Sequence, residues 1–152
     1  MSMEENKAII RRFYDEAINR RHLAVLDEIL APDFEGFKAE GIERASNREN
    51  FKHILAFALR TFPDCQQTIH DWNIEKDVVV TRWSLCGKQK GEYLGLPGIE
   101  KQFRATGSDT FRLIGGKIME HGLNLTRCTW GDRSRLLSLL IMKEKSDGYD
   151  YE

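Results

Sequence analysis

The chain has 152 residues, 41% of them hydrophobic, and its 23 basic and 24 acidic side chains nearly cancel. That length suits one domain with a substantial core and is short for two. The balanced charge lacks the basic excess that favours nucleic acid or an anionic membrane as a partner. No apolar run approaches the length of a transmembrane helix.

Cysteine usage points to a reducing compartment. Cys65, Cys86 and Cys128 are odd in number and widely spaced, and no CxxC pair suggests zinc. The first residues lack the basic start and apolar run of a secretory signal. We therefore predict a cytoplasmic protein with one domain over residues 1–146 and a polar, frayed tail over 147–152.

The first half of the chain predicts helices. Apolar residues recur every three or four positions over 4–20 and again over a shorter stretch, 23–31, which a proline terminates. Residues 33–43 are expected to form a loop or a short strand. A capping box at 46–49 (SNRE) begins the third predicted helix, which ends at Pro63.

The second half predicts strands in two hairpins. The first pairs 68–74 with 78–86, and the second pairs 102–113 with 117–125. A glycine-rich connection at 88–98 lies between the two hairpins. Helices followed by strands favour an α+β fold with an antiparallel sheet. A curved sheet wrapped around the N-terminal helices would leave a cone-shaped cavity.

The second hairpin holds the most informative polar residues. A three-residue loop at 114–116 would set Asp109 opposite His121 and Phe111 opposite Met119. The period of two places these residues on one otherwise apolar face. An acid and an imidazole therefore lie together on that face, as in a small enclosed active site or in a buried structural pair.

Asp109 and His121 are the candidate catalytic residues. On an apolar face a carboxyl group loses hydration, so a protonated Asp109 could donate to a developing oxyanion, whereas an ionised one could take a proton. His121 could shuttle a proton or orient Asp109. The alternative is that both are simply satisfied by neighbouring hydrogen bonds.

Other types of chemistry lack support in the sequence. No two histidines stand four residues apart and no carboxylate completes a metal triad, so we predict no metal and no cofactor. The GxSxG, GxxxxGK and GxGxxG motifs are absent, which argues against a serine nucleophile, phosphoryl transfer and a bound nicotinamide. Aromatic side chains could wall an apolar pocket or simply fill the core. We expect Trp83, Tyr93 and Phe111 to line it.

Seven segments, spread over roughly four-fifths of the chain, are specific as a set although each is weak alone. They are 6–14 (NKAIIRRFY), 26–34 (LDEILAPDF), 61–64 (TFPD), 80–83 (VTRW), 91–97 (GEYLGLP), 109–112 (DTFR) and 116–121 (GKIMEH). Together they resemble the SnoaL-like polyketide cyclases and ester cyclases of the NTF2-like superfamily. The resemblance implies an NTF2-like cone, a homodimer through the sheet, and intramolecular aldol ring closure on an aromatic polyketide ester without cofactor or metal.

The resemblance transfers only in part to individual positions. Asp109 stands where characterised cyclases have a pocket histidine and where the related ketosteroid isomerases have an oxyanion-binding aspartate. The acid/base aspartate of the cyclases falls at Leu123, and the tyrosine and base of the isomerases fall near Phe13 and Phe37. These three positions lack the corresponding groups. We expect them to be apolar walls of the substrate pocket, and isomerase activity is disfavoured.

After His121 the chain departs from the family pattern, which expects Trp next. Here 122–131 reads GLNLTRCTWG. With suitable codons, restoring one nucleotide after His121 yields the family-like continuation Trp-Ala-Glu-Leu-Asp-Ala-Leu. We hypothesise that the residues after His121 come from a shifted reading frame. The coding DNA tests this hypothesis, because the absence of a nearby frame with that continuation contradicts it.

Two functions follow from the residues and the resemblance. The first is a cofactor-independent, polyketide cyclase-like enzyme that performs acid–base chemistry on a small apolar metabolite with a carbonyl group. The second is a non-catalytic NTF2-like ligand-binding or dimerisation domain, in which Asp109 and His121 form a structural pair. An open cavity that exposes Asp109 favours the enzyme, and a cavity filled by side chains favours the binding domain.

Overall fold

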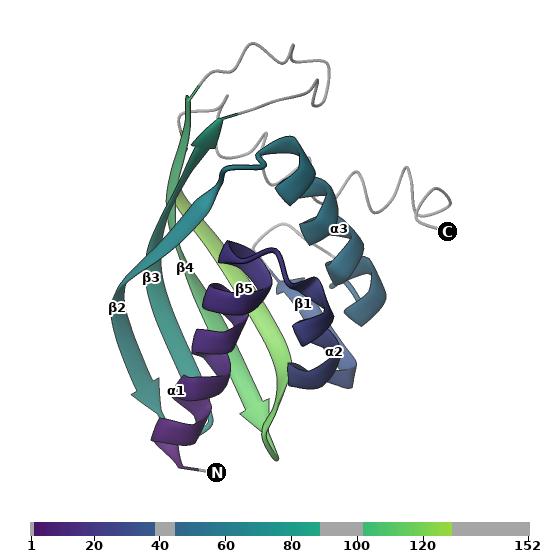
Figure 1. Cartoon of the computed structure of the whole chain (residues 1–152). Helices are drawn as coiled ribbons and strands as arrows, with labels where there is room; N and C mark the ends of the chain where they lie inside the picture. The colour runs from purple at the N-terminus through teal and green to yellow at the C-terminus, as the bar shows by residue number, and fades with distance from the viewer. Residues whose placement is uncertain (1, 39–44, 89–101, 129–152) are drawn as a thin grey trace.

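The computed structural model describes residues 2–38, 45–88 and 102–128. Figure 1 shows the helices on one side of a curved, open sheet of five strands, which is the expected α+β architecture. No helix in these three segments is long and apolar enough to cross a membrane. The predictions for Tyr93, for most of the glycine-rich connection and for the tail lie outside the described residues.

The helix predicted for 4–20 is confirmed as one continuous helical stretch that is α-helical first and π-helical after that. The α-helix α1 (Met3–Arg12) continues directly into the π-helix η1 (Phe13–Asn19). Ser2 begins it with a capping box: its hydroxyl accepts from the Glu5 N–H at 3.1 Å, and the Glu5 carboxylate accepts from the Ser2 N–H. π-Helical turns are rare and occur frequently at functional sites.

The prediction for the second helix is wrong in its extent. A 3₁₀ turn, η2 (Leu23–Val25), leads into the single turn α2 (Leu26–Ile29), and strand β1 (Leu30–Lys38) begins at once. Pro32 therefore lies within a strand and does not end the helix. A sheet tolerates proline on an edge strand, and β1 is an edge strand here.

Helix α3 (Arg48–Thr61) begins one residue later than the predicted capping box implies. The side-chain oxygen of Asn47 accepts from the Asn50 N–H at 2.9 Å, so Asn47 is the N-cap. Ser46 instead exchanges backbone hydrogen bonds with Gly36 of β1, at 2.7 and 2.9 Å. The predicted N-cap lies one residue before the N-cap that the structure shows.

The sheet has the order β1-β5-β4-β3-β2. Both predicted antiparallel hairpins are present, and β3 pairs with β4 to join them. The edge strand β1, expected only as a loop or short strand, pairs in parallel with β5. Parallel neighbours need a long connection, and the intervening chain from α3 to β4 supplies it. The other strands are β2 (Gln66–Glu75), β3 (Val78–Lys88), β4 (Gln102–Ile114) and β5 (Lys117–Cys128).

The turn of the second hairpin is shorter than predicted. Ile114 pairs with Lys117, so only Gly115 and Gly116 form the loop, with φ angles of 57° and 82°. Two successive residues with positive φ form the type I′ turn that matches the twist of paired strands. A bulge at Met119 then shifts the register again.

These two shifts change the predicted pairing. Phe111 pairs with His121, and Asp109 pairs with Leu123, so Asp109 and His121 are diagonal neighbours and not direct partners. Ile118, which is fully buried, takes the core position expected for the bulged Met119. The predicted face is unchanged, because the shorter turn and the bulge at Met119 together leave His121 and Asp109 on the side of the sheet that the helices cover.

The core lies between that face and the helices. Its aromatic centre joins three elements, because the Phe13 ring lies 5.3 Å from Phe111 and 6.1 Å from Phe51. A second cluster lies nearer the end of α3 and contains Phe62, Cys65, Trp83, Ala105 and Leu125. Burial of these large side chains is the main source of stability in such a fold.

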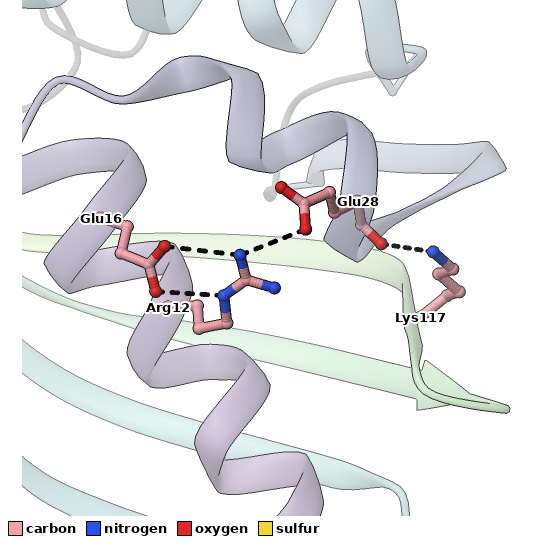
Figure 2. Close-up of polar contacts among 4 residues, drawn as sticks. All are labelled: Arg12, Glu16, Glu28 and Lys117. Carbon is pink, nitrogen blue, oxygen red and sulfur yellow. Dashed lines mark hydrogen bonds and ion pairs between the residues drawn. The ribbon is translucent and has the colours of Figure 1, made fainter.

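A polar contact network links the helices to the sheet at the surface. Figure 2 shows Arg12 between Glu16, at 3.0 Å, and Glu28, at 3.3 Å, while Lys117 donates to the backbone oxygen of Glu28. These side chains are partly exposed, so each ion pair contributes at most about 1 kcal/mol. The network positions α2 without dominating stability.

Candidate active site

Asp109 lies within β4, between Thr81 of β3 and Leu123 of β5. Its side chain is on the helix-covered face and the residue is 3% exposed. A buried carboxyl group needs hydrogen-bond partners, because an unpaired one would carry a large desolvation cost. The structure supplies these partners from two directions.

The first partner is His121. Its Nε2 lies 3.0 Å from Oδ1 of Asp109, and both side chains are about 95% buried. The Nδ1 atom of His121 accepts a hydrogen bond from the backbone N–H of Phe37 at 3.1 Å. Since Nδ1 is an acceptor, the proton of the neutral ring is on Nε2 and is donated to Asp109. Both ring nitrogens are therefore engaged.

Phe37 holds this arrangement with an unusual backbone. Its φ angle is 55°, a left-handed conformation that is uncommon for a bulky residue. Such strain persists only where surrounding contacts maintain it, and it is concentrated at functional sites. The ring of Phe37 provides those contacts. Its centroid lies 4.6 Å from that of the Phe51 ring and 5.3 Å from that of the His121 ring, to which it is edge-on.

The second partner of Asp109 is Tyr14, which the sequence analysis missed. The Tyr14 hydroxyl donates to Oδ2 of Asp109, and the Thr81 hydroxyl oxygen lies 2.6 Å from it. Because the single Tyr14 proton goes to Asp109, the Thr81 hydroxyl donates to Tyr14. Burial, followed by the charge of Asp109, raises the pKa of Tyr14 well above its ordinary value. Tyr14 therefore remains a donor.

Two sequence signals for this pair were available. Tyr14 lies in the buried stripe of the first helix, next to Phe13, where the resemblance places the isomerases' tyrosine. Thr81 lies at the position on β3 that pairs with Asp109. Neither signal is specific, because polar residues on a buried stripe are commonly ordinary core residues. Only the packing of η1 over the sheet brings the hydroxyl to Asp109.

Asp109 and His121 lie in the wall of an apolar cavity of about 130 Å³. Most of the wall consists of aliphatic and aromatic side chains from η1, α3 and the sheet. The lining residues are Phe13, Ile18, Phe37, Phe51, Leu55, Ala58, Leu59, Phe62, Cys65, Gln67, Trp83, Leu85, Asp109, His121, Leu123 and Leu125.

Four of the expected wall residues, Phe13, Phe37, Trp83 and Leu123, line this cavity. Phe111 is not among the described lining residues. It is fully buried beneath the site, with its ring 5.3 Å from both Phe13 and His121. Phe111 therefore supports the site from behind.

Trp83 is the most unusual of the lining residues. It is 4% exposed, and its indole Nε1 has no hydrogen-bond partner within the described part of the chain. A buried donor without an acceptor costs about 1–3 kcal/mol. The ring lies over Gly107, where a Cβ atom would come within 2.8 Å of Trp83 Cζ2. A glycine on β4 thus provides the space for the indole.

Cys65 adds a thiol to the same wall. Burial raises its pKa to about 12, so the thiol stays neutral near pH 7 and is a poor nucleophile. Across residues 2–38, 45–88 and 102–128, no three His, Cys, Asp or Glu side chains lie together as potential metal ligands. The chemically distinctive group in the wall is therefore the Asp109 carboxylate.

The carboxylate is suited to accept a proton. Among the residues that the structure describes, each oxygen of Asp109 accepts one hydrogen bond, from Tyr14 or from His121, whereas a carboxylate has about four acceptor positions. Acceptor capacity is therefore left for a ligand in the cavity. His121 cannot shuttle a proton in this arrangement without breaking its bond to Phe37, so it orients Asp109.

Comparison with known proteins gives the evolutionary context of the site. The family model "SnoaL-like polyketide cyclase" matches residues 8–123, ending two residues after His121, near the departure noted in the sequence. No curated protein matches the chain.

Several solved structures are similar in fold. IdmH from Streptomyces antibioticus, a candidate polyketide cyclase, is 28% identical, with a TM-score of 0.69 over 79% of this chain and 91% of IdmH. AclR from Streptomyces galilaeus, a candidate hydroxylase, is 23% identical, with a TM-score of 0.74 over 82% of this chain and 91% of AclR. A candidate SnoaL-like polyketide cyclase from a Jannaschia species is 20% identical, with a TM-score of 0.74 over 90% of this chain and 92% of that protein. The chain belongs to the SnoaL-like polyketide cyclase family.

Proposed function

We propose that this protein is a cofactor-independent enzyme that removes a proton from a carbon next to a carbonyl group in a small apolar metabolite. The observation that carries the proposal is the placement of the Asp109 carboxylate in the wall of an apolar cavity, with acceptor capacity left over. Proton abstraction of this kind is the step that an intramolecular aldol cyclisation requires. Family membership supports a polyketide-like substrate and a homodimer.

Each residue has a defined role. Asp109 takes the proton, and the donors Tyr14 and His121 hold its two oxygens in place. The Phe37 N–H fixes the His121 ring in the tautomer that donates to Asp109. The apolar wall excludes water, which strengthens electrostatic interactions inside the cavity.

The test is the variant Asp109→Asn in an assay of hydrogen–deuterium exchange. Wild type should speed exchange of the methyl protons next to the carbonyl of at least one aryl methyl ketone in D₂O, measured by ¹H NMR. The panel is acetophenone, 2-acetylnaphthalene and 2-acetylanthracene. Loss of the general base should slow that exchange by about 10²–10⁴-fold.

The hydrogen bonds around Asp109 make this variant a clean test. The Asn oxygen can accept from His121, and its NH₂ group can donate to Tyr14 once the Tyr14 hydroxyl turns toward Thr81. We therefore expect unchanged folding by circular dichroism. Asp33→Asn, at an exposed position on β1, is the matched control and should retain full exchange. Unchanged exchange in Asp109→Asn would remove Asp109 from the mechanism.

A non-catalytic binding domain is the second candidate. Leu123 pairs with Asp109 at the position where the resemblance expects an acid/base aspartate, which favours this alternative. Binding of the ketones without exchange by the wild-type protein would support this alternative over the enzyme.

A further inference from the structure

The proposed proton abstraction needs a hydrogen-bond donor for the carbonyl oxygen of the substrate, in addition to Asp109, Tyr14 and His121. When a proton leaves the carbon next to a carbonyl, negative charge develops on the carbonyl oxygen and must be stabilised by a donor. His121 already donates its Nε2–H to Asp109, and its Nδ1 accepts from Phe37. Tyr14 has one proton, which also goes to Asp109. Neither neighbour of Asp109 has a donor left.

Trp83 has the missing donor. Its indole N–H has no partner among the described residues, the side chain is more than nine-tenths buried, and the residue lines the same cavity as Asp109. Trp83 pairs with Gly107, two residues from Asp109 on β4. Trp83 and Asp109 are therefore diagonal neighbours on the same face of the sheet, with Cα atoms roughly 7–8 Å apart, and both line one cavity.

We infer that Trp83 is a catalytic residue whose indole N–H binds the carbonyl oxygen of the substrate, and that the substrate is a ketone with an apolar group the size of one ring. This inference rests on the proposed function. The C–H bond next to the carbonyl breaks, its proton moves to an oxygen of Asp109, and its electron pair forms the enolate. The Trp83 N–H donates to the enolate oxygen, and Asp109 later returns the proton.

The size of the cavity sets the substrate class. Its volume of about 130 Å³ is close to the roughly 150 Å³ of an apolar cavity that holds benzene. Pockets for drug-sized ligands measure about 300–1,000 Å³. One ring with one carbonyl therefore matches the volume of this cavity.

The first test observes the indole N–H directly in the full-length protein. The chain has three tryptophans, Trp72, Trp83 and Trp130, so ¹⁵N-labelled protein should show three indole signals, assigned by the variants Trp83→Phe and Trp72→Phe. Acetophenone should shift the Trp83 proton signal downfield. α-Methylstyrene, which has nearly the same shape but no oxygen, should produce no downfield shift. An absent shift with acetophenone, or an equal one with α-methylstyrene, contradicts the inference.

The second test uses the exchange assay. Trp83→Phe keeps an apolar wall but removes the donor, so exchange of acetophenone protons should slow by about 10²–10³-fold, mainly in kcat. Trp72→Phe is the matched control, because the Trp72 ring contacts Lys7 and Arg11 and does not line the cavity. It should exchange at the wild-type rate. Wild-type exchange in Trp83→Phe contradicts the assignment.

The two proposals can fail separately. Asp109→Asn should lose exchange but keep the acetophenone-induced shift of the Trp83 signal. Retained exchange in Asp109→Asn would overturn the proposed function. If exchange were retained and acetophenone still shifted the Trp83 signal in that variant, Trp83 would be a donor that binds the ligand and has no catalytic role. Lost exchange together with an unshifted Trp83 signal would overturn the role of Trp83 alone. Equal affinity for acetophenone and 2-acetylnaphthalene would overturn the single-ring limit.

Discussion

Asp109 is held by residues from three other elements, and no two of these residues are close in sequence. Tyr14 comes from η1, His121 from β5, and Phe37 of β1 acts through His121. Each contact defines the position or hydrogen-bonding role of one group, so the carboxylate has little rotational freedom. A base held in this way loses little entropy when the substrate binds.

Removing the Tyr14 hydroxyl should weaken both the fold and the site. Tyr14→Phe keeps the ring but leaves Oδ2 of Asp109 without a donor and Thr81 without an acceptor. We expect the free energy of unfolding to fall by about 1–3 kcal/mol, measured by urea denaturation. Adding Thr81→Val to this variant should cost little more, because the partner of Thr81 is already gone. Fully additive losses would argue against a shared network.

Cys65 should make the protein sensitive to alkaline pH. Its pKa is raised from 9.0 to about 12, so the folded state keeps a proton that the unfolded chain loses above pH 9. The associated stability is fully present below pH 9 and is lost as the pH rises toward 12. For each pH unit above 9, the free energy of unfolding should fall by about 1.4 kcal/mol more in wild type than in Cys65→Ala. Tyr14, whose pKa is also raised, contributes equally to both proteins. Parallel stability curves between pH 9 and 11 would contradict the assignment.

The β4–β5 hairpin shows how local backbone geometry sets the site. The glycine turn and the bulge at Met119 together decide which residue of β5 pairs with Asp109. A change of one residue in either feature would move His121 to the other face of the sheet. The turn is therefore a positioning element although it lies away from the cavity.

Substitution of Gly115 should test the turn by backbone strain alone, because a Cβ there would meet nothing within 4 Å. Its φ of 57° suits Asn but not a β-branched residue. Gly115→Asn should be nearly neutral, and Gly115→Val should lose about 1–2 kcal/mol of stability in urea denaturation. Equal stability of the two variants would show that the turn is not of this type.

At the scale of the whole molecule, the helices of the described residues lie on one face of the sheet (Figure 1). The family resemblance predicts that a second copy of the chain covers the other face. Sedimentation equilibrium should then give twice the 17.6 kDa mass of one chain. A single-chain mass at micromolar concentration would contradict this prediction.

Much of the fold could be predicted from the sequence because its signals are local. Alternation in β4 and β5 identified the face that holds Asp109, and a helical period identified the buried stripe of the first helix. The errors occurred where two local signals competed. Pro32 suggested a helix end but lies in an edge strand, and the Gly115-Gly116 pair suggested a longer loop. The family resemblance then indicated how the elements assemble.

The sequence by itself determined the fold class, the polar pair on an apolar face, and the family. Only the tertiary structure decided the partners of that pair. Tyr14 and Asp109 are 95 residues apart, and no local pattern encodes a contact over that distance. The tertiary structure likewise shows that both ring nitrogens of His121 are hydrogen-bonded, whereas the Trp83 N–H has no partner within the described residues. The physical reason is that hydrogen bonds form between groups that packing brings together, whereas periodicity reports only the face on which a residue lies.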